Sequence, residues 1–174
     1  MGAKFFNYAK HGVCETSGVT ASICGHLYHL KADVDIDNGS VVALGDFVKG
    51  EVWKAKIPAK TDKVILINTS VVIYETYTKK CQEESNFFNE KGETMRGFEV
   101  RVTDTFTLSE ECFEENSTPA AGKYVSVDGI GYKLTVSDTA PTDTAFVGYI
   151  YDIAPNGNFR IIVQKNDDNF TPAA

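Results

Sequence analysis

Three aspartates at alternate positions, Asp33, Asp35 and Asp37, have a spacing that could do chemistry. Their carboxylates could bind Ca²⁺ or Mg²⁺, which prefer oxygen ligands. A calcium loop of the EF-hand type requires glycine at its sixth position and glutamate at its twelfth. Counting from Asp33, these positions hold Asn38 and Leu44. Carboxylates on one strand face also repel each other unless a cation lies among them, so we expect a solvated strand face rather than a metal site.

The cluster at residues 24–29 (CGHLYH) contains the side chains that zinc prefers, a thiol and two imidazoles. Cys14 or His11 could complete a set of four ligands. The spacing matches no recurrent zinc motif. On a strand, moreover, Cys24 and His26 would share one face while the second histidine of the cluster points to the other. We therefore expect no metal and no cofactor in this segment.

Nucleophilic catalysis would need a cysteine or serine beside a general base. Cys81 and Cys112 have no histidine near them in sequence, although one distant in sequence could still lie beside them in the fold. The chain contains no GxSxG motif and no glycine-rich phosphate loop, so we expect a non-enzymatic protein. Adjacent acids, which point apart on a strand or helix and make poor acid–base pairs, occur at Glu83-Glu84, Glu110-Glu111 and Glu114-Glu115.

Large aromatic side chains stand in polar segments of the chain, where a monomeric protein gains little from them. A protein that docks onto another protein uses such side chains as anchors that fill pockets of its partner. The alternative is that these side chains fold back onto the core of their own domain. The candidates for partner binding are Phe5, Phe6, Tyr8, His11, Tyr28, Phe87 and Phe88.

The chain of 174 residues carries a formal net charge of −7, from 17 basic and 24 acidic residues. Binding to nucleic acid requires a basic face, so this acidic balance argues against it. No apolar run is long enough to span a bilayer, and the first residues lack the pattern of a secretory signal. The four cysteines are widely spaced and suggest no disulfide framework, which indicates synthesis in a reducing compartment.

The elements that must position these side chains are strands. Short apolar and β-branched runs recur between turns rich in glycine and asparagine, and no segment sustains helical periodicity. This pattern predicts an all-β fold, mainly an antiparallel sandwich or a small barrel, with an extended N-terminal arm. We divide the chain into the arm (1–30), a β-rich domain (31–166) and a flexible C-terminal tail (167–174).

Some of these strands can be predicted individually. In residues 31–47, alternating apolar and charged residues around Asn38-Gly39 predict a hairpin with a tight turn. Residues 64–67 are continuously apolar, which predicts a strand covered on both faces. Ser109 is placed to cap a helical turn. Further strands are expected at 71–77, at 98–102 paired with 105–108, at 122–127 paired with 132–136, and at 147–153 paired with 159–163.

Four segments carry a family resemblance. They are FNYAKHGVCETSGVTA (6–21), KADVDIDNGSVVALGDFVKGEV (31–52), ESNFFNEKGETMRGFEV (84–100) and NGNFRIIVQK (156–165). Together they resemble a small β-rich structural protein encoded in the head-gene region of tailed bacteriophages that infect Gram-positive hosts. The resemblance implies a decoration-type protein of the virion capsid, and it brings no catalytic residues.

The same resemblance implies that the partner is the major capsid protein and that the chain is a homo-oligomer, a dimer or trimer, on the shell. It implies localisation in the virion after synthesis in the host bacterial cytoplasm. It leaves open whether the chain is a decoration protein or the base of a head fibre, and which face of the shell it occupies. The alternative hypothesis is a carbohydrate- or receptor-binding module of a head fibre or tail, in which Trp53 and the tyrosines would stack on sugar rings. Trp53, however, stands in an alternating apolar run, where core packing is the default.

Overall fold

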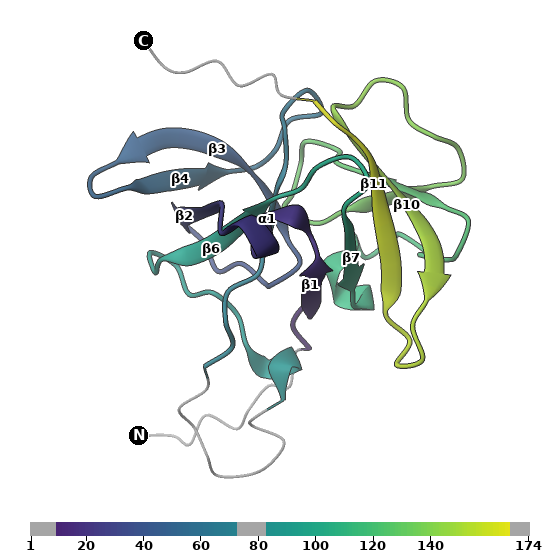
Figure 1. Ribbon diagram of the computed structural model, residues 1–174, viewed down its shortest axis with the longest axis horizontal. Helices are drawn as coiled ribbons and strands as arrows, with labels where there is room; N and C mark the ends of the chain where they lie inside the picture. Colours follow the sequence, from purple (N-terminus) through teal and green to yellow (C-terminus); the bar gives the residue numbers. More distant parts are fainter. Residues whose placement is uncertain (1–9, 73–82, 168–174) are drawn as a thin grey trace.

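The computed structural model describes residues 10–72 and 83–167, which form two β-sheets (Figure 1). The first sheet has six strands in the order β1-β7-β11-β10-β8-β9, and every neighbouring pair is antiparallel. Along the chain its strands are β1 (Cys14–Gly18), β7 (Thr105–Leu108), β8 (Tyr124–Ser126), β9 (Thr135–Ser137), β10 (Phe146–Ile153) and β11 (Phe159–Asn166).

The second sheet closes into a five-stranded barrel in the order β2-β4-β3-β5-β6. Within it β2 and β4 are parallel and the other pairs are antiparallel. Its strands are β2 (Leu27–Lys31), β3 (Val41–Val48), β4 (Val52–Lys56), β5 (Ile65–Ile67) and β6 (Met95–Glu99). The helical segments described are short, namely α1 (Thr20–Cys24), η2 (Glu84–Asn86) and η3 (Glu110–Cys112). The predicted all-β fold is thereby confirmed, as a sheet layer combined with a small barrel.

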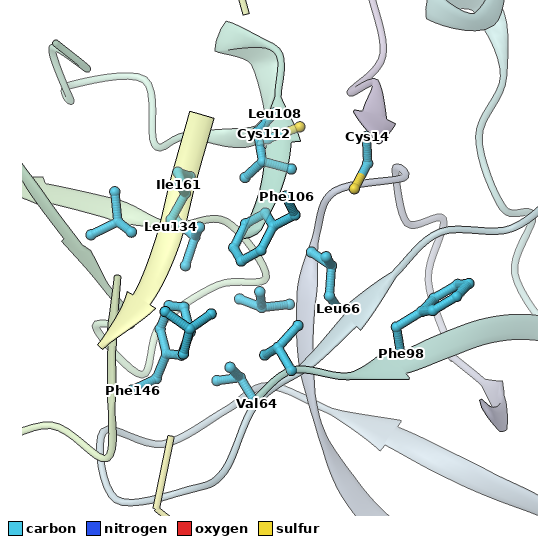
Figure 2. Close-up of a cluster of buried hydrophobic side chains, with 14 of the residues drawn as sticks. Cys14, Val64, Leu66, Phe98, Phe106, Leu108, Cys112, Leu134, Phe146 and Ile161 are labelled. Atoms are coloured by element: carbon cyan, nitrogen blue, oxygen red, sulfur yellow. The ribbon is translucent and has the colours of Figure 1, made fainter. Parts of the chain in front are cut away.

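The six-stranded sheet packs against the outside of the barrel. Phe106, Phe146 and Ile161 from the sheet meet Leu66 and Phe98 from the barrel in one buried cluster (Figure 2). A second buried cluster takes side chains from all five barrel strands and fills the barrel interior. The molecule therefore has two apolar cores that share the barrel wall.

Strand β5 belongs to both cores because successive side chains of a strand point to opposite faces. Leu66 lies in the cluster facing the six-stranded sheet, while Ile65 and Ile67 lie in the barrel interior. All three side chains are fully buried. The prediction of a strand covered on both faces at residues 64–67 is confirmed. On β6, a Cβ at Gly97 would collide with the side chains of Leu30 and Ile65 from the two neighbouring strands, β2 and β5. The packing of these three strands therefore requires glycine at position 97.

The predicted hairpin over residues 31–47 is wrong. β2 pairs with β4 and β6, and β3 pairs with β4 and β5, so the two strands are not neighbours. The two strands are connected by a loop, in which Ile36 forms an isolated antiparallel β-bridge with the distant residue Asn89. The predicted turn at Asn38-Gly39 is present, since Gly39 has a φ of 83° and the backbone N–H of Ser40 donates to the carbonyl of Asp37 at 3.3 Å. Asn38 is buried there, and its side chain exchanges two hydrogen bonds of 2.9 Å with the backbone of Thr69.

The predicted pairing of residues 98–102 with 105–108 is also wrong, since β6 and β7 belong to different sheets. Asp104 holds the crossover between them. Its carboxylate accepts hydrogen bonds from the backbone N–H of Thr20 at 3.1 Å and of Arg101 at 2.9 Å. Thr103 takes a left-handed conformation there (φ 79°), a strained geometry for a β-branched residue. The chain therefore leaves the barrel at this point instead of turning back on β6.

The turn after Ser109 is a short 3₁₀ segment, η3, and the Ser109 side chain does not cap it. The Ser109 hydroxyl oxygen instead accepts a hydrogen bond from the backbone N–H of Val13 at 3.0 Å. Elsewhere, the predicted strand pairs at the C-terminal end are confirmed: β8 pairs with β9, and β10 pairs with β11. These pairs are joined by short connections, which is why local sequence could find them.

Residues 14–30, which the sequence assigns to the N-terminal arm, supply β1, α1 and all of β2 except its last residue, Lys31. Val19 and Leu30 are fully buried, one in each core. This part of the chain therefore contributes one strand to each sheet, β1 to the six-stranded sheet and β2 to the barrel. The predicted strand at 71–77 lies mostly outside the described residues, and its first two residues, Val71 and Val72, are exposed and belong to no strand.

Candidate functional site

Three segments far apart in sequence meet around His11. The backbone N–H of His11 donates to the carbonyl of Ser85 at 2.7 Å, which ties the residues before β1 to η2. Its ring nitrogen Nδ1 lies 2.7 Å from Oδ1 of Asp37, and the backbone N–H of Gly12 donates to the other oxygen of that carboxylate at 3.1 Å. Asp37 therefore fixes both the backbone and the ring at the start of β1.

The ring of His11 stacks on the ring of Phe88, with centroids 4.8 Å apart and planes 29° from parallel. Both side chains are half-buried, so part of each ring faces solvent. Phe87 is half-buried too, and its backbone N–H closes η2 by donating to Glu84. We call the surface formed by His11, Asp37, Phe87 and Phe88 the aromatic patch.

Two buried asparagines hold the aromatic patch from beneath. The side-chain amide of Asn89 donates to the carbonyl of Ile36 at 3.0 Å and to the side-chain oxygen of Asn38 at 3.1 Å. Ile36 and Asn89 also exchange backbone hydrogen bonds of 2.8 and 2.9 Å. Buried polar side chains with full sets of partners rigidify their surroundings. The loop before β3 and the segment after η2 therefore present the patch as one preformed unit.

The other candidates from the sequence do not join this patch. Tyr28 lies on β2, where its half-buried ring packs against the barrel core and meets His26 edge-on at 5.3 Å. Phe5, Phe6 and Tyr8 lie outside the described residues. The structure thus brings together His11 with Phe88 and its neighbour Phe87, and places Tyr28 apart from them.

A cleft of about 440 Å³ opens beside the aromatic patch, with Asp37 in its wall. Its charged lining is mostly acidic and consists of Asp35, Asp37, Glu114, Glu115 and Lys133. The lining also includes the buried residue Ile36 and the half-buried residue Tyr132. Such a cleft attracts basic groups by charge and excludes acidic ones.

The three aspartates lie in the loop before β3 rather than on a strand face. Asp33 forms an ion pair with Lys54 at 2.7 Å, and the hydrogen bond and positive charge of Lys54 lower the pKa of Asp33. Asp35 accepts a hydrogen bond from the backbone N–H of Lys91 at 2.8 Å. Each aspartate therefore has a structural partner. Among the described residues no three His, Cys, Asp or Glu side chains gather as a metal-binding group.

Cys112 comes close to the histidine-bearing site. Its sulfur packs against Gly12 and Gly39, and a Cβ at either glycine would collide with it. The sulfur of Cys112 lies 3.5 Å from the carbonyl oxygen of Asn38 and 3.7 Å from the carbonyl oxygen of Val13, and the thiol can donate a hydrogen bond to either oxygen. Burial raises the pKa of Cys112 to about 12. A protonated, buried thiol is a weak nucleophile, so the geometry makes Cys112 a packing residue.

One exposed aromatic group escaped the sequence analysis. Phe47 stands at the end of the β3–β4 hairpin with 58% of its surface exposed, and its ring meets that of Trp53 edge-on at 5.0 Å. Trp53 itself is half-buried against the barrel core. The sequence signal that could have found it is Gly50 between two apolar runs, which is typical of a hairpin turn. A hairpin with its turn at Gly50 places Phe47 near the tip.

These features define an all-β protein in which a five-stranded barrel and a six-stranded sheet support a preformed aromatic patch. The sequence matches no protein-family model, and neither the curated proteins nor the solved structures give a significant match to it. No helix in the described part of the chain is long and apolar enough to cross a membrane.

Proposed function

We propose that this chain is a non-enzymatic structural protein that binds the capsid shell of a tailed bacteriophage and stabilises or decorates it. The observation that carries the proposal is the half-buried stack of His11 on Phe88, held in place by Asp37. Aromatic side chains, Phe included, are enriched at protein–protein interfaces relative to the rest of a protein surface. The four segments that resemble phage head proteins support the choice of partner, and two of them include the stack.

The negative charge of the acidic cleft favours a partner whose surface carries basic groups. The acidic cleft adjoins the aromatic patch through Asp37, so a surface that covers both features has to supply an apolar pocket and basic groups together. In this proposal the major capsid protein supplies them. The negative charge of the chain keeps free copies apart until they reach the shell.

The rigidity of the patch favours binding. Association costs free energy when side chains and loops must be ordered at the interface. The hydrogen bonds among Asn38, Asn89 and Ile36 hold the loops beneath the patch before any partner arrives. A contact of modest area on each copy is sufficient, because many symmetry-related sites on a shell act together.

The test measures how much purified chain co-sediments with capsid shells that lack it, over a range of chain concentrations. Phe88→Ala removes one ring of the stack and leaves the bond between His11 and Asp37 in place. We expect its affinity for shells to fall about tenfold or more. Tyr151→Ala removes an aromatic ring that is 45% exposed on β10 and serves as the control, with unchanged binding expected.

A second variant addresses the first residues of the chain. Deletion of residues 2–9 removes Phe5, Phe6 and Tyr8 but leaves β1 intact. Deletion of residues 2–30 would remove β1 and all of β2 except Lys31, and would disrupt both sheets. We expect reduced occupancy for the shorter deletion. Wild-type occupancy of the Phe88→Ala variant would contradict the role of the aromatic patch. Failure of the unaltered chain to bind any shell would contradict the proposed function itself.

A further inference from the structure

The acidic cleft lies where loops of the two sheets meet. One wall is the loop before β3, residues 35–40, and the other comes from the segments before β8 and β9 of the six-stranded sheet. A hydrogen bond of 2.8 Å from the backbone N–H of Val41 to the carbonyl of Tyr132 joins the walls, and one of 3.0 Å from Glu114 to Leu134 joins the two segments of the second wall. The cleft is therefore a fixed feature, and its volume of about 440 Å³ is within the range of roughly 300–1,000 Å³ that is typical of ligand pockets.

The chain itself does not neutralise the carboxylates of the cleft. Of the described basic residues, only His11 lies within ion-pair distance of a cleft carboxylate, that of Asp37. Lys133 lines the cleft but forms no ion pair with any described residue. By contrast, Asp33 and Asp62, outside the cleft, each pair with a lysine. The cleft therefore keeps a negative potential that a cation from another molecule can neutralise.

Ser40 provides a second, independent sign of a ligand. The residue is only 4% exposed, and its backbone groups are occupied, since its N–H donates to Asp37 and its carbonyl accepts from Ile67. Its side-chain hydroxyl has no hydrogen-bond partner within the described residues. Every fully enclosed side-chain oxygen or nitrogen in this part of the chain has a partner, so the hydroxyl reaches the space that Ser40 lines, which is the cleft. A ligand that donates a hydrogen bond there supplies the partner that the chain does not provide.

The spread of the cleft oxygens selects the shape of the cation. Among the residues that the structure describes, no three His, Cys, Asp or Glu side chains converge as a metal-binding group, so one metal ion does not contact several cleft carboxylates at once. The guanidinium of arginine carries five N–H donors spread over a rigid plane, whereas the ammonium of lysine is a compact point charge. A planar cation therefore reaches separated acceptors that a point charge does not.

We propose that the cleft binds the guanidinium group of an arginine side chain, supplied by the protein that covers the aromatic patch. The carboxylate of Glu114 and the hydroxyl of Ser40, from opposite walls, accept its N–H groups. Asp37 belongs to both the patch and the cleft, so this arginine lies beside the aromatic contact. The inference rests on the proposed function, because it names the basic group that the shell protein contributes. Binding of the guanidinium itself can be measured without shells.

The test is an NMR titration of the isolated full chain with N-acetylarginine amide. We expect saturable binding with a dissociation constant below about 10 mM, and shifts of the amides at residues 35–40 and 114–116. N-acetyllysine amide is expected to bind at least about threefold more weakly, because its ammonium reaches fewer acceptors. N-acetylcitrulline amide has nearly the shape of the arginine probe but no charge, and is expected to bind at least about tenfold more weakly.

Two variants separate a role in binding from a role in folding. Glu114→Gln keeps the shape of a half-buried side chain but removes its charge, and is expected to weaken binding of the arginine probe at least about fivefold. Ser40→Ala removes the hydroxyl, so binding should weaken about threefold while the free energy of unfolding stays unchanged. Glu51→Gln, at an exposed carboxylate in the turn between β3 and β4, is the matched control and is expected to bind like the unaltered chain.

Equal affinity for the three probes, shifts confined to another surface, or a Glu114→Gln variant that binds like Glu51→Gln would each overturn the inference. Absence of saturable binding would overturn it as well. These results differ from a failure of the proposed function. A chain that binds shells but not the arginine probe contradicts this inference alone, whereas a chain that binds the probe but no shell contradicts shell binding and supports the assignment of the cleft.

Discussion

Of the two candidate nucleophiles from the sequence, Cys112 is the one that lies within the described residues, whereas Cys81 lies outside them. The Cβ position of Gly12 adjoins both the sulfur of Cys112 and the side chain of Asp37, and Asp37 binds His11. A cysteine, a histidine and an acid thus lie in one region. The nucleophile of a cysteine enzyme is the thiolate, and burial raises the pKa of Cys112 to about 12, so the thiol is protonated at neutral pH. Burial here suppresses the chemistry that the residue types would allow.

Thiol labelling provides a direct check on this conclusion. In a Cys81→Ser variant of the native protein, we expect one cysteine, the exposed Cys24, to react rapidly with a thiol reagent near neutral pH. Cys14 and Cys112 are buried, and burial raises the pKa of both. They should react only when the protein unfolds, as mass spectrometry of labelled peptides would show. Rapid labelling of native Cys112 would instead indicate an activated thiolate and restore the enzymatic hypothesis.

At this scale sequence reasoning found the residue types but not the contacts. His11 and Phe88 were both candidates as aromatic groups in polar segments, yet nothing local indicates that residues 77 positions apart stack on each other. The turn signal of Asn38-Gly39 was read correctly, but the strands on either side of this turn do not pair with each other. The local sequence also did not indicate the burial of Asn38. Its side chain satisfies distant backbone groups at Thr69, and such long-range hydrogen bonds leave no local pattern.

At the scale of elements, the positions of strands were more predictable than their pairing. Alternation predicted β7 at its observed position but placed the preceding strand at 98–102, which shares only Phe98 and Glu99 with β6. A strand pattern also does not state which sheet a strand enters. β10 and β11 were paired correctly because a short turn forces neighbours together. The crossover after β6 depends instead on Asp104, whose carboxylate binds backbone groups on either side of it.

Glu99 at the end of β6 provides a test of how one element is secured. Its carboxylate lies 2.5 Å from the ammonium of Lys63 and 3.2 Å from the guanidinium of Arg101, and its side chain is 12% exposed. Burial by itself would raise the pKa of Glu99, but the hydrogen bonds and charges of Lys63 and Arg101 outweigh it and lower the pKa. The folded protein therefore stabilises the ionised form of the Glu99 side chain relative to the protonated form.

A carboxyl group with a lower pKa in the folded chain adds stability above its ordinary pKa of 4.5, and this stability disappears as the pH falls through the folded-state value. We expect Glu99→Gln to lower the free energy of unfolding by about 2 kcal/mol at neutral pH. The difference from the unaltered protein should shrink as the pH falls below 4.5. Urea titrations across pH measure it, with Glu93→Gln, an exposed carboxylate, as the control. A difference that persists at low pH would contradict the assignment.

At the scale of the whole molecule, the two cores are joined rather than separate. The cluster between the sheets includes barrel residues such as Leu66 and Phe98 together with Phe106 and Phe146 from the six-stranded sheet. The side-chain amide of Asn166, at the end of β11, adds hydrogen bonds between the sheets. It donates to the carbonyl of Val64 before β5 at 3.0 Å and to that of Val100 after β6 at 2.8 Å. Composition and strand spacing predicted a sandwich or a barrel. The molecule combines both, because the continuously apolar β5 has an apolar face for each.

This sharing predicts that the chain unfolds as one unit. Leu66→Ala opens a cavity between the sheets, and Ile67→Ala opens one inside the barrel, so each should lower the free energy of unfolding by about 2–5 kcal/mol. Trp53 fluorescence follows the barrel, and near-ultraviolet dichroism of the Tyr124–Tyr149 pair follows the six-stranded sheet. Both signals should show one coincident transition in urea, and each variant should shift both equally, whereas Ile130→Ala in an exposed loop should shift neither. Two separate transitions, or a variant that moves only one signal, would mean that the barrel and the sheet are independent folding units and that β5 does not couple them.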